Sequence, residues 1–246
     1  MRLTIMILTV ASLIGGLGPM LAQAQHSGDM WLAVSSTGQL KLSALGFQPD
    51  FTGEAVVRLN PASGLLDGWT GNNPGFDDIE TADPQNDDYP LADGANVWLE
   101  IIAIDPALIV WAPGLTQYFN EPGQQIEIGS APGDIHMHLT WHINSNDPQF
   151  DVYCVHWRLT CRLTDAGSTT YSPSEAFTLV FSNVDCMLGE FTGDELVNAY
   201  DIDGFIAAVA DPLAAPDEVR CAADANMDGF VNAYDIDWFI ALVAGG

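Results

Sequence analysis

Basic residues are scarce in this sequence. Six lysines and arginines stand against 33 aspartates and glutamates, and Lys41 is the sole lysine. The formal charge of −27 argues against a nucleic acid as partner, because binding to phosphates relies on clustered lysine and arginine. It argues equally against an anionic membrane surface, which attracts basic segments. An acidic surface of this kind stays soluble in salt and suits divalent cations.

Long hydrophobic runs are missing beyond the N-terminus. No later segment reaches the about 18 apolar residues of a membrane span, so none is predicted in the mature chain. Residues 1–24 match a secretory signal peptide, with a charged start at Arg2, a short apolar run, and the cleavage site Ala22-Gln23-Ala24. We therefore expect a secreted protein that is extracellular or held at the cell surface, with the periplasm as the alternative.

Cysteine is also rare, and the four cysteines fit an oxidising compartment. Cys154 and Cys161 fall in one expected strand. An extended chain would hold them about 23 Å apart on opposite faces, which excludes a bridge between them because bridged Cα atoms lie within about 7 Å.

An internal repeat occupies the C-terminus. Residues 197–203 read Val-Asn-Ala-Tyr-Asp-Ile-Asp, and residues 231–237 repeat these seven letters without change. Apolar residues at helical spacing follow each copy. Identity at a fixed offset of 34 residues indicates two copies of one structural unit.

The second copy, residues 224–235, has the spacing of a calcium loop. Gly229 at position 6 permits the sharp turn, and Asp235 replaces the usual Glu at position 12. Alternating oxygen donors suit a hard cation, and the expected ligands are Asp224, Asn226, Asp228, the Phe230 carbonyl, Asn232 and Asp235.

The first copy, residues 190–201, is degenerate. Glu195 stands where glycine is needed, and a side chain in a left-handed turn costs about 1 kcal/mol or more. We expect this loop to bind calcium weakly or not at all, through Glu190, Thr192, Asp194, Leu196, Asn198 and Asp201.

Two such loop–helix repeats resemble a type I dockerin, over residues 186–246. The resemblance implies a small all-α, calcium-folded module that attaches to a cohesin-like protein or another extracellular protein. It implies that loop positions 10 and 11 help to choose the partner, here Ala199 and Tyr200 in one repeat and Ala233 and Tyr234 in the other. A cysteine shortly before each loop, Cys186 and Cys221, favours a disulfide that joins the repeats.

Residues 25–185 form a separate domain of short strands between Gly, Pro and Asx turns. This pattern predicts an antiparallel β-sandwich of immunoglobulin or jelly-roll type. The acidic stretch 61–94 is expected to be a long loop, either a solvated flap or a binding loop. The predicted strands cover residues 31–35, 39–45, 55–59, 97–104, 108–111, 124–128, 135–144, 152–163 and 176–181.

The strand 135–144 carries three histidines at even positions, His136, His138 and His142. Period two places them on one face. Pairing with the strand 152–163 would bring Cys154 or His156 alongside. The interpretation is either a histidine-decorated polar face or a zinc or copper site, completed by His26 or a carboxylate such as Asp134.

Three functions follow from these observations. The first is a secreted, non-catalytic binding or structural protein with a calcium-binding attachment module. The second is a component of extracellular polysaccharide degradation, carbohydrate-binding or associated with glycoside hydrolases. The third is a zinc- or copper-binding protein. Neither a Gly-x-Ser-x-Gly elbow nor a His-Glu-x-x-His helix occurs, and no catalytic residue is nominated.

Overall fold

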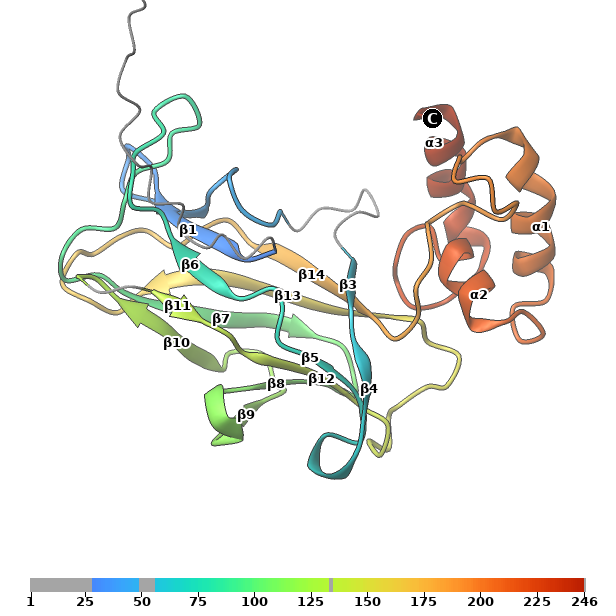
Figure 1. Cartoon of the computed structure of the whole chain (residues 1–246), viewed down its shortest axis with the longest axis horizontal. Helices are drawn as coiled ribbons and strands as arrows, with labels where there is room; N and C mark the ends of the chain where they lie inside the picture. Colours follow the sequence, from blue (N-terminus) through green and yellow to red (C-terminus); the bar gives the residue numbers. More distant parts are fainter. Residues whose placement is uncertain (1–27, 49–55, 133–134, 246) are drawn as a thin grey trace, which may run out of the picture.

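A computed structural model describes residues 28–48, 56–132 and 135–245. The expected signal peptide, His26 and Asp134 lie outside these ranges. The chain is mostly β, with short helices gathered near its C-terminus at one end of the sheets (Figure 1). We call residues 28–185 the β region and residues 186–245 the C-terminal region.

The described residues of the β region form three sheets. The first has the order β11 (His136–Met137), β6 (Phe76–Asp78), β1 (Met30–Val34) and β2 (Leu40–Leu42). The second has the order β10 (Gln125–Ser130), β7 (Asn96–Ile104), β13 (His156–Asp165), β14 (Phe177–Ser182) and β3 (Val56–Arg58). The third has the order β4 (Asn60–Ala62), β5 (Gly68–Gly71), β12 (Thr140–Asn144), β8 (Leu108–Trp111) and β9 (Tyr118–Phe119).

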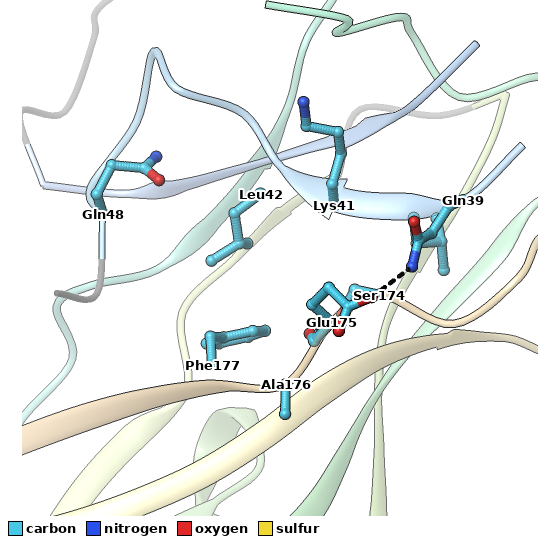
Figure 2. Close-up of a pocket in the computed structure, with 9 residues that line it drawn as sticks. Gln39, Lys41, Leu42, Gln48, Ser174, Glu175, Ala176 and Phe177 are labelled. Carbon is cyan, nitrogen blue, oxygen red and sulfur yellow. Dashed lines mark hydrogen bonds between the residues drawn. The ribbon is translucent and has the colours of Figure 1, made fainter. Parts of the chain in front are cut away.

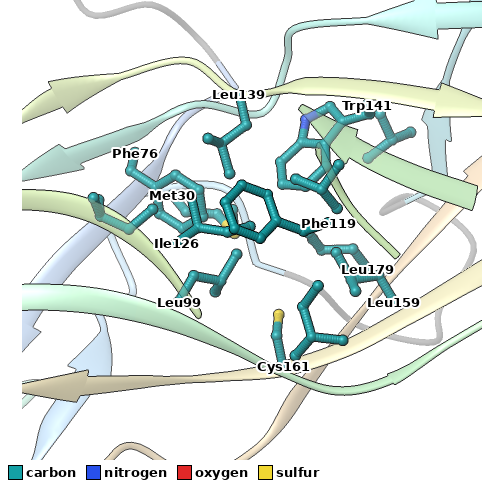
Figure 3. Close-up of a cluster of buried hydrophobic side chains, with 14 of the residues drawn as sticks. Met30, Phe76, Leu99, Phe119, Ile126, Leu139, Trp141, Leu159, Cys161 and Leu179 are labelled. Carbon is teal, nitrogen blue, oxygen red and sulfur yellow. The ribbon is translucent and has the colours of Figure 1, made fainter. Parts of the chain in front are cut away.

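All three sheets contribute to one hydrophobic core (Figure 3). Along β13 the buried residues alternate with half-buried ones, because successive side chains of a strand point to opposite faces. Trp141 from the third sheet lies against Phe181 of the second, with ring centroids 5.2 Å apart. Each large apolar side chain buried in this way contributes about 1.5–3 kcal/mol to folding.

Two features of the predicted β region are wrong. The acidic stretch 61–94 is not one loop, because it contains most of β4 and all of β5 and β6. These strands have only three or four residues, too few for alternation to be visible in the sequence. The sheets are also not purely antiparallel, since β1 pairs with β6 and β14 pairs with β3 in parallel.

The histidine strand is divided. His136 lies on β11 in the first sheet, whereas His142 lies on β12 in the third. β12 pairs with β5 and β8, and β13 pairs with β14 and β7. The predicted hairpin that would bring Cys154 or His156 beside His138 and His142 is therefore wrong.

The C-terminal region contains three α-helices, α1 (Ile202–Ala210), α2 (Asp217–Ala223) and α3 (Ile236–Gly245). Short 3₁₀ turns, η3 (Ala199–Asp201) and η4 (Ala233–Asp235), lead into α1 and α3; two others, η1 (Gly64–Leu66) and η2 (Pro113–Leu115), lie in the β region. Among the described residues, no helix has the length and hydropathy needed to cross a membrane.

The Cys186–Cys221 disulfide is present, as predicted, with Cα atoms 5.9 Å apart. Cys154 and Cys161 are free thiols buried in the β region. Burial raises the pKa of the Cys154 thiol to about 12, and burial likewise raises the pKa of Cys161. Both are therefore protonated at neutral pH.

Candidate metal centre

The two repeats begin their helices in the same way. The Asn198 side chain accepts a hydrogen bond from the Tyr200 backbone N–H at 2.8 Å, and Asn232 accepts one from Tyr234 at 2.8 Å. Asp201 and Asp235 complete a capping box in their respective repeats. Such reciprocal bonds satisfy backbone donors that a helix N-terminus leaves open. The identical residues thus produce identical local structures.

The second loop folds its backbone around the carboxylates of Asp224 and Asp235. Asp224 accepts hydrogen bonds from the backbone N–H groups of Asp228 (3.0 Å) and Gly229 (2.8 Å). Asp235 accepts hydrogen bonds from the N–H groups of Asn226 (3.1 Å) and Asn232 (2.8 Å). These bonds fold the loop around its acidic side chains, so that oxygen donors from both ends of the loop come together.

Electrostatics in this loop favour uptake of a positive charge. Burial raises the pKa of Asp235 to about 6, although backbone hydrogen bonds from Asn232 and Asn226 oppose the shift. The nearby Asp224 and Asp228 carboxylates raise this pKa further. A proton or a cation therefore relieves repulsion within the loop. Carboxylate, amide and carbonyl oxygens are the donors that Ca²⁺ prefers.

Glycine is required at position 6 of the second loop for two reasons. Gly229 has a φ of 93°, which side-chain-bearing residues rarely adopt. A Cβ atom there would also lie 2.7 Å from Cys154 Sγ and 2.9 Å from the His156 carbonyl oxygen. The loop is thus packed directly against the β region.

Two residues of β13 hold the second loop. His156 Nδ1 donates a hydrogen bond to Asp224 Oδ2 at 2.7 Å, and both side chains are fully buried. The Arg158 guanidinium donates to the Asn226 carbonyl. The sequence predicts the strand that carries His156 and Arg158 but not their contact with the second loop, because periodicity does not reveal what covers a strand face.

The first loop is stabilised by its own glutamate. Glu190 Oε1 accepts hydrogen bonds from the backbone N–H groups of Thr192, Gly193 and Asp194. Glu195 takes the place of Gly229 and has a φ of 63°, the strained conformation that the sequence predicts. Among the remaining predicted ligands, Thr192, Asp194 and Leu196 are exposed. Asp201 is buried, and its carboxylate accepts hydrogen bonds from the N–H groups of Phe191, Thr192 and Asn198.

His142 is separated from the other two predicted histidine ligands. It is buried beside Trp111, whose Nε1–H donates to His142 Nδ1 at 3.3 Å, and His142 Nε2 lies 3.2 Å from the Asp67 carbonyl oxygen. Burial lowers the pKa of His142. The predicted set of three histidines is therefore not assembled. His136 and His138 do lie together, with ring centroids 5.0 Å apart.

The four residues at loop positions 10 and 11 are exposed. Tyr200 is 81% exposed and Tyr234 is 80% exposed, and Ala199 and Ala233 also face solvent. Between α1 and α3 lies an apolar groove of about 500 Å³. The groove is lined by Ile202, Phe205, Ile206, Val209, Ala210, Ile236, Phe239 and Ile240.

A cleft of about 240 Å³ opens between β2 and the segment before β14 (Figure 2). Lys41 lines it, and Gln39 Nε2 donates to Glu175 Oε1 at 3.3 Å. Lys41 also forms an ion pair with Asp88, so its charge is matched by the protein itself. None of the predicted site residues lies in this cleft.

The cluster of His156, Cys186 and Cys221 has the donor types of a metal site. The two cysteines are joined as a disulfide, however, and the thiolate is the form of cysteine that ligates metals. These three residues therefore do not form a metal site while the disulfide is intact.

Comparison of the chain with known protein families, with curated proteins and with solved structures finds no match.

Proposed function

We propose that this chain is a secreted, non-catalytic binding protein whose C-terminal region is a calcium-organised, dockerin-like attachment module. In this proposal, the second loop holds Ca²⁺ through the six predicted ligands, residues 224–235. The first loop keeps its shape through hydrogen bonds from its backbone to Glu190 and Asp201. The β region acts as a sandwich-like scaffold, and the C-terminal region docks onto a folded extracellular protein.

The observation that carries the proposal is a pseudo-twofold apolar surface. Ile202 and its equivalent Ile236 are each 40% exposed, and Ile206 and Ile240 are 57% and 58% exposed. A monomeric protein rarely exposes such contiguous apolar area without a partner.

The centre of this surface is rigid. Phe205 and its equivalent Phe239 stack in parallel with ring centroids 4.0 Å apart. A buried aromatic pair of this kind fixes the angle between α1 and α3. Because the exposed residues on either side are equivalent, a partner can meet the same chemistry in two orientations related by about half a turn. The expected partner is a folded protein domain with a complementary apolar face, similar to a cohesin.

Calcium would organise this surface through the loop that precedes α3. Asp235 is both a predicted ligand and the capping-box residue of η4. Neutralising the carboxylates of the second loop would therefore stabilise the start of α3 and the position of Tyr234.

The experiment is capture of an extracellular protein on the immobilised mature chain, with calcium or with a chelator. We expect one protein to be retained only with calcium, and to be lost with the double variant Ile206→Asp/Ile240→Asp. Each single variant should keep binding, because the other half of the surface is intact. Retention by the double variant, or equal loss in both single variants, would contradict two-fold docking.

A further inference from the structure

Three neighbouring chain segments bring two histidines and two aspartates to one edge of the first sheet. His136 on β11 is the register partner of Asp77 on β6, and Trp31 on β1 is the parallel partner of the same Asp77. Continuing both registers by two residues aligns His138, Gly75 and Asp29 across the three segments. These side chains share a face, because positions two apart on a strand point the same way.

Gly75 allows His138 and Asp29 to meet. A Cβ atom on Gly75 would lie 2.7 Å from both Nδ1 and Cε1 of the His138 ring and 3.0 Å from Asp29 Oδ1. The Gly75 N–H donates to Asp29 Oδ1 at 2.9 Å, which fixes the carboxylate. Because Gly75 has no side chain, the space above it is occupied by the side chains of His138 and Asp29.

The remaining oxygen of Asp29 lies in an unusual environment for a carboxylate. Asp29 is 1% exposed, and its Oδ2 atom accepts no hydrogen bond from the part of the chain that the structure describes. Within the described ranges it forms an ion pair with His138 Nε2 at 3.8 Å, beyond the 2.7–3.2 Å range of a hydrogen bond. Burial of an oxygen anion without hydrogen bonds is costly, and a cation would remove this cost.

The tautomer of His138 suits a ligand. Its Nδ1 lies 2.8 Å from the Asn72 carbonyl oxygen. A carbonyl can only accept, so Nδ1 carries a proton, and the neutral form of the ring has its lone pair on Nε2, the atom that faces Asp29. A backbone carbonyl that fixes the opposite nitrogen is the usual partner of a metal-ligating histidine.

We propose that Asp29, His136 and His138 bind a divalent transition-metal ion such as Zn²⁺, a site separate from the calcium loop. One donor atom from each of the three residues lies within 4.8 Å of the others. Zinc bonds of about 2.0–2.2 Å require a contraction of roughly 1 Å, which side-chain rotation supplies. Asp77 Oδ2 lies 3.7 Å from His136 Nδ1, and a small movement on metal binding would let it accept a hydrogen bond from that ring.

Two histidines and one carboxylate leave a coordination position for water or a small ligand. Zinc sites with three protein ligands have this composition, whereas structural sites are closed by four. The His136 and His138 side chains are 40% and 25% exposed, so the open position faces solvent.

The test is zinc titration of the full mature chain, purified without a histidine tag, in calcium sufficient to fill the second loop. A chromophoric chelator competes for zinc. We expect one tight equivalent in the native chain. His136→Gln and His138→Gln should each weaken binding at least 100-fold, and Asp77→Asn roughly 10–100-fold, the range for lost outer partners of a ligand.

Two controls separate the alternatives. Glu80→Gln changes an exposed carboxylate three positions after Asp77 in the sequence and should leave zinc affinity unchanged. Asp228→Asn removes a predicted calcium ligand and should also leave it unchanged, so failure of the calcium loop is distinguishable from failure of this site. Because His136 is partly exposed, His136→Gln should keep the native circular dichroism. A native chain that takes up no zinc, or histidine variants that bind zinc as tightly as the native chain, would show that the cluster is only an ion-pair network.

Discussion

His156 Nδ1 lies 2.7 Å from Asp224 Oδ2, and this hydrogen bond joins the β region to the first residue of the second loop in a fully buried environment. A buried carboxylate needs such partners, because its desolvation is otherwise uncompensated. The loop and β13 therefore form one cooperative contact. An ion that stabilises the loop should also stabilise the β region.

Replacement of His156 should weaken the contact between the second loop and β13. His156→Ala removes a hydrogen bond to a charged group, so the free energy of unfolding should fall by at least about 1.5–3 kcal/mol. Calcium affinity should fall as well, because Asp224 loses its orienting partner. Urea unfolding with calcium and with chelator measures both effects. His136→Gln, remote from the loop, is the control, and an equal loss of calcium affinity in both variants would contradict the coupling.

Calcium binding should weaken as the pH falls below about 6, the pKa that burial gives Asp235. The ordinary value is 3.8. Between these values the calcium-free folded chain holds a proton that the unfolded chain has lost, so the stability of the calcium-free chain falls as the pH rises through this window.

Calcium must displace that proton. Its affinity should therefore drop by up to about tenfold per pH unit below pH 6. Calcium titrations at pH values on both sides of 6 measure the slope, with Asp93→Asn as an exposed control. An affinity that is flat across this range would show that Asp235 is not a ligand.

Equivalent positions of the two loops should respond in opposite directions to substitution. Glu195→Gly relieves a left-handed residue and should raise the free energy of unfolding by up to about 1 kcal/mol. Gly229→Ala introduces a Cβ atom 2.7 Å from Cys154 Sγ at a φ of 93°, and should lower it by more than that. Thermal unfolding of both variants compares them. A Gly229→Ala variant with the thermal stability of the native chain would contradict the tight packing of the second loop on the β region.

The Cys186–Cys221 disulfide closes a segment of 35 residues that contains the first loop and α1. The double variant Cys186→Ser/Cys221→Ser should lose about 4 kcal/mol of stability by the chain-entropy estimate. Urea unfolding of the native chain in reductant should match that of the double variant without reductant. If the native chain and the double variant gave the same urea unfolding curve without reductant, a stabilising role of the disulfide would be contradicted. The buried thiols of Cys154 and Cys161 should stay unreactive toward thiol reagents until the chain unfolds.

The repeat could be predicted because it depends on local sequence, and the disulfide could be predicted because a cysteine stands shortly before each copy. The capping boxes follow from Asn198 and Asn232, and their spacing to Asp201 and Asp235 is visible in the letters. The β pairings could not be predicted, since strands as short as β6 leave no periodic pattern. The division of the histidine strand depends on which sheets compete for β11 and β12, and that competition is decided by long-range packing.

Asp29 illustrates the same limit for the metal-ligating candidates. Its sequence neighbours give no indication that it meets His138, because Gly75 creates the space from a third segment. The role of His156 was likewise hidden by the packing of the C-terminal region on β13.

The most direct test of the account is calorimetric titration of calcium into the chelator-treated mature chain and two matched variants. We predict one strong site in the native chain. That site should be lost in Asp235→Asn and retained in Asp201→Asn, which changes the equivalent residue of the degenerate loop. No calcium uptake by the native chain, or equal loss in the two variants, would contradict a calcium centre in the second loop.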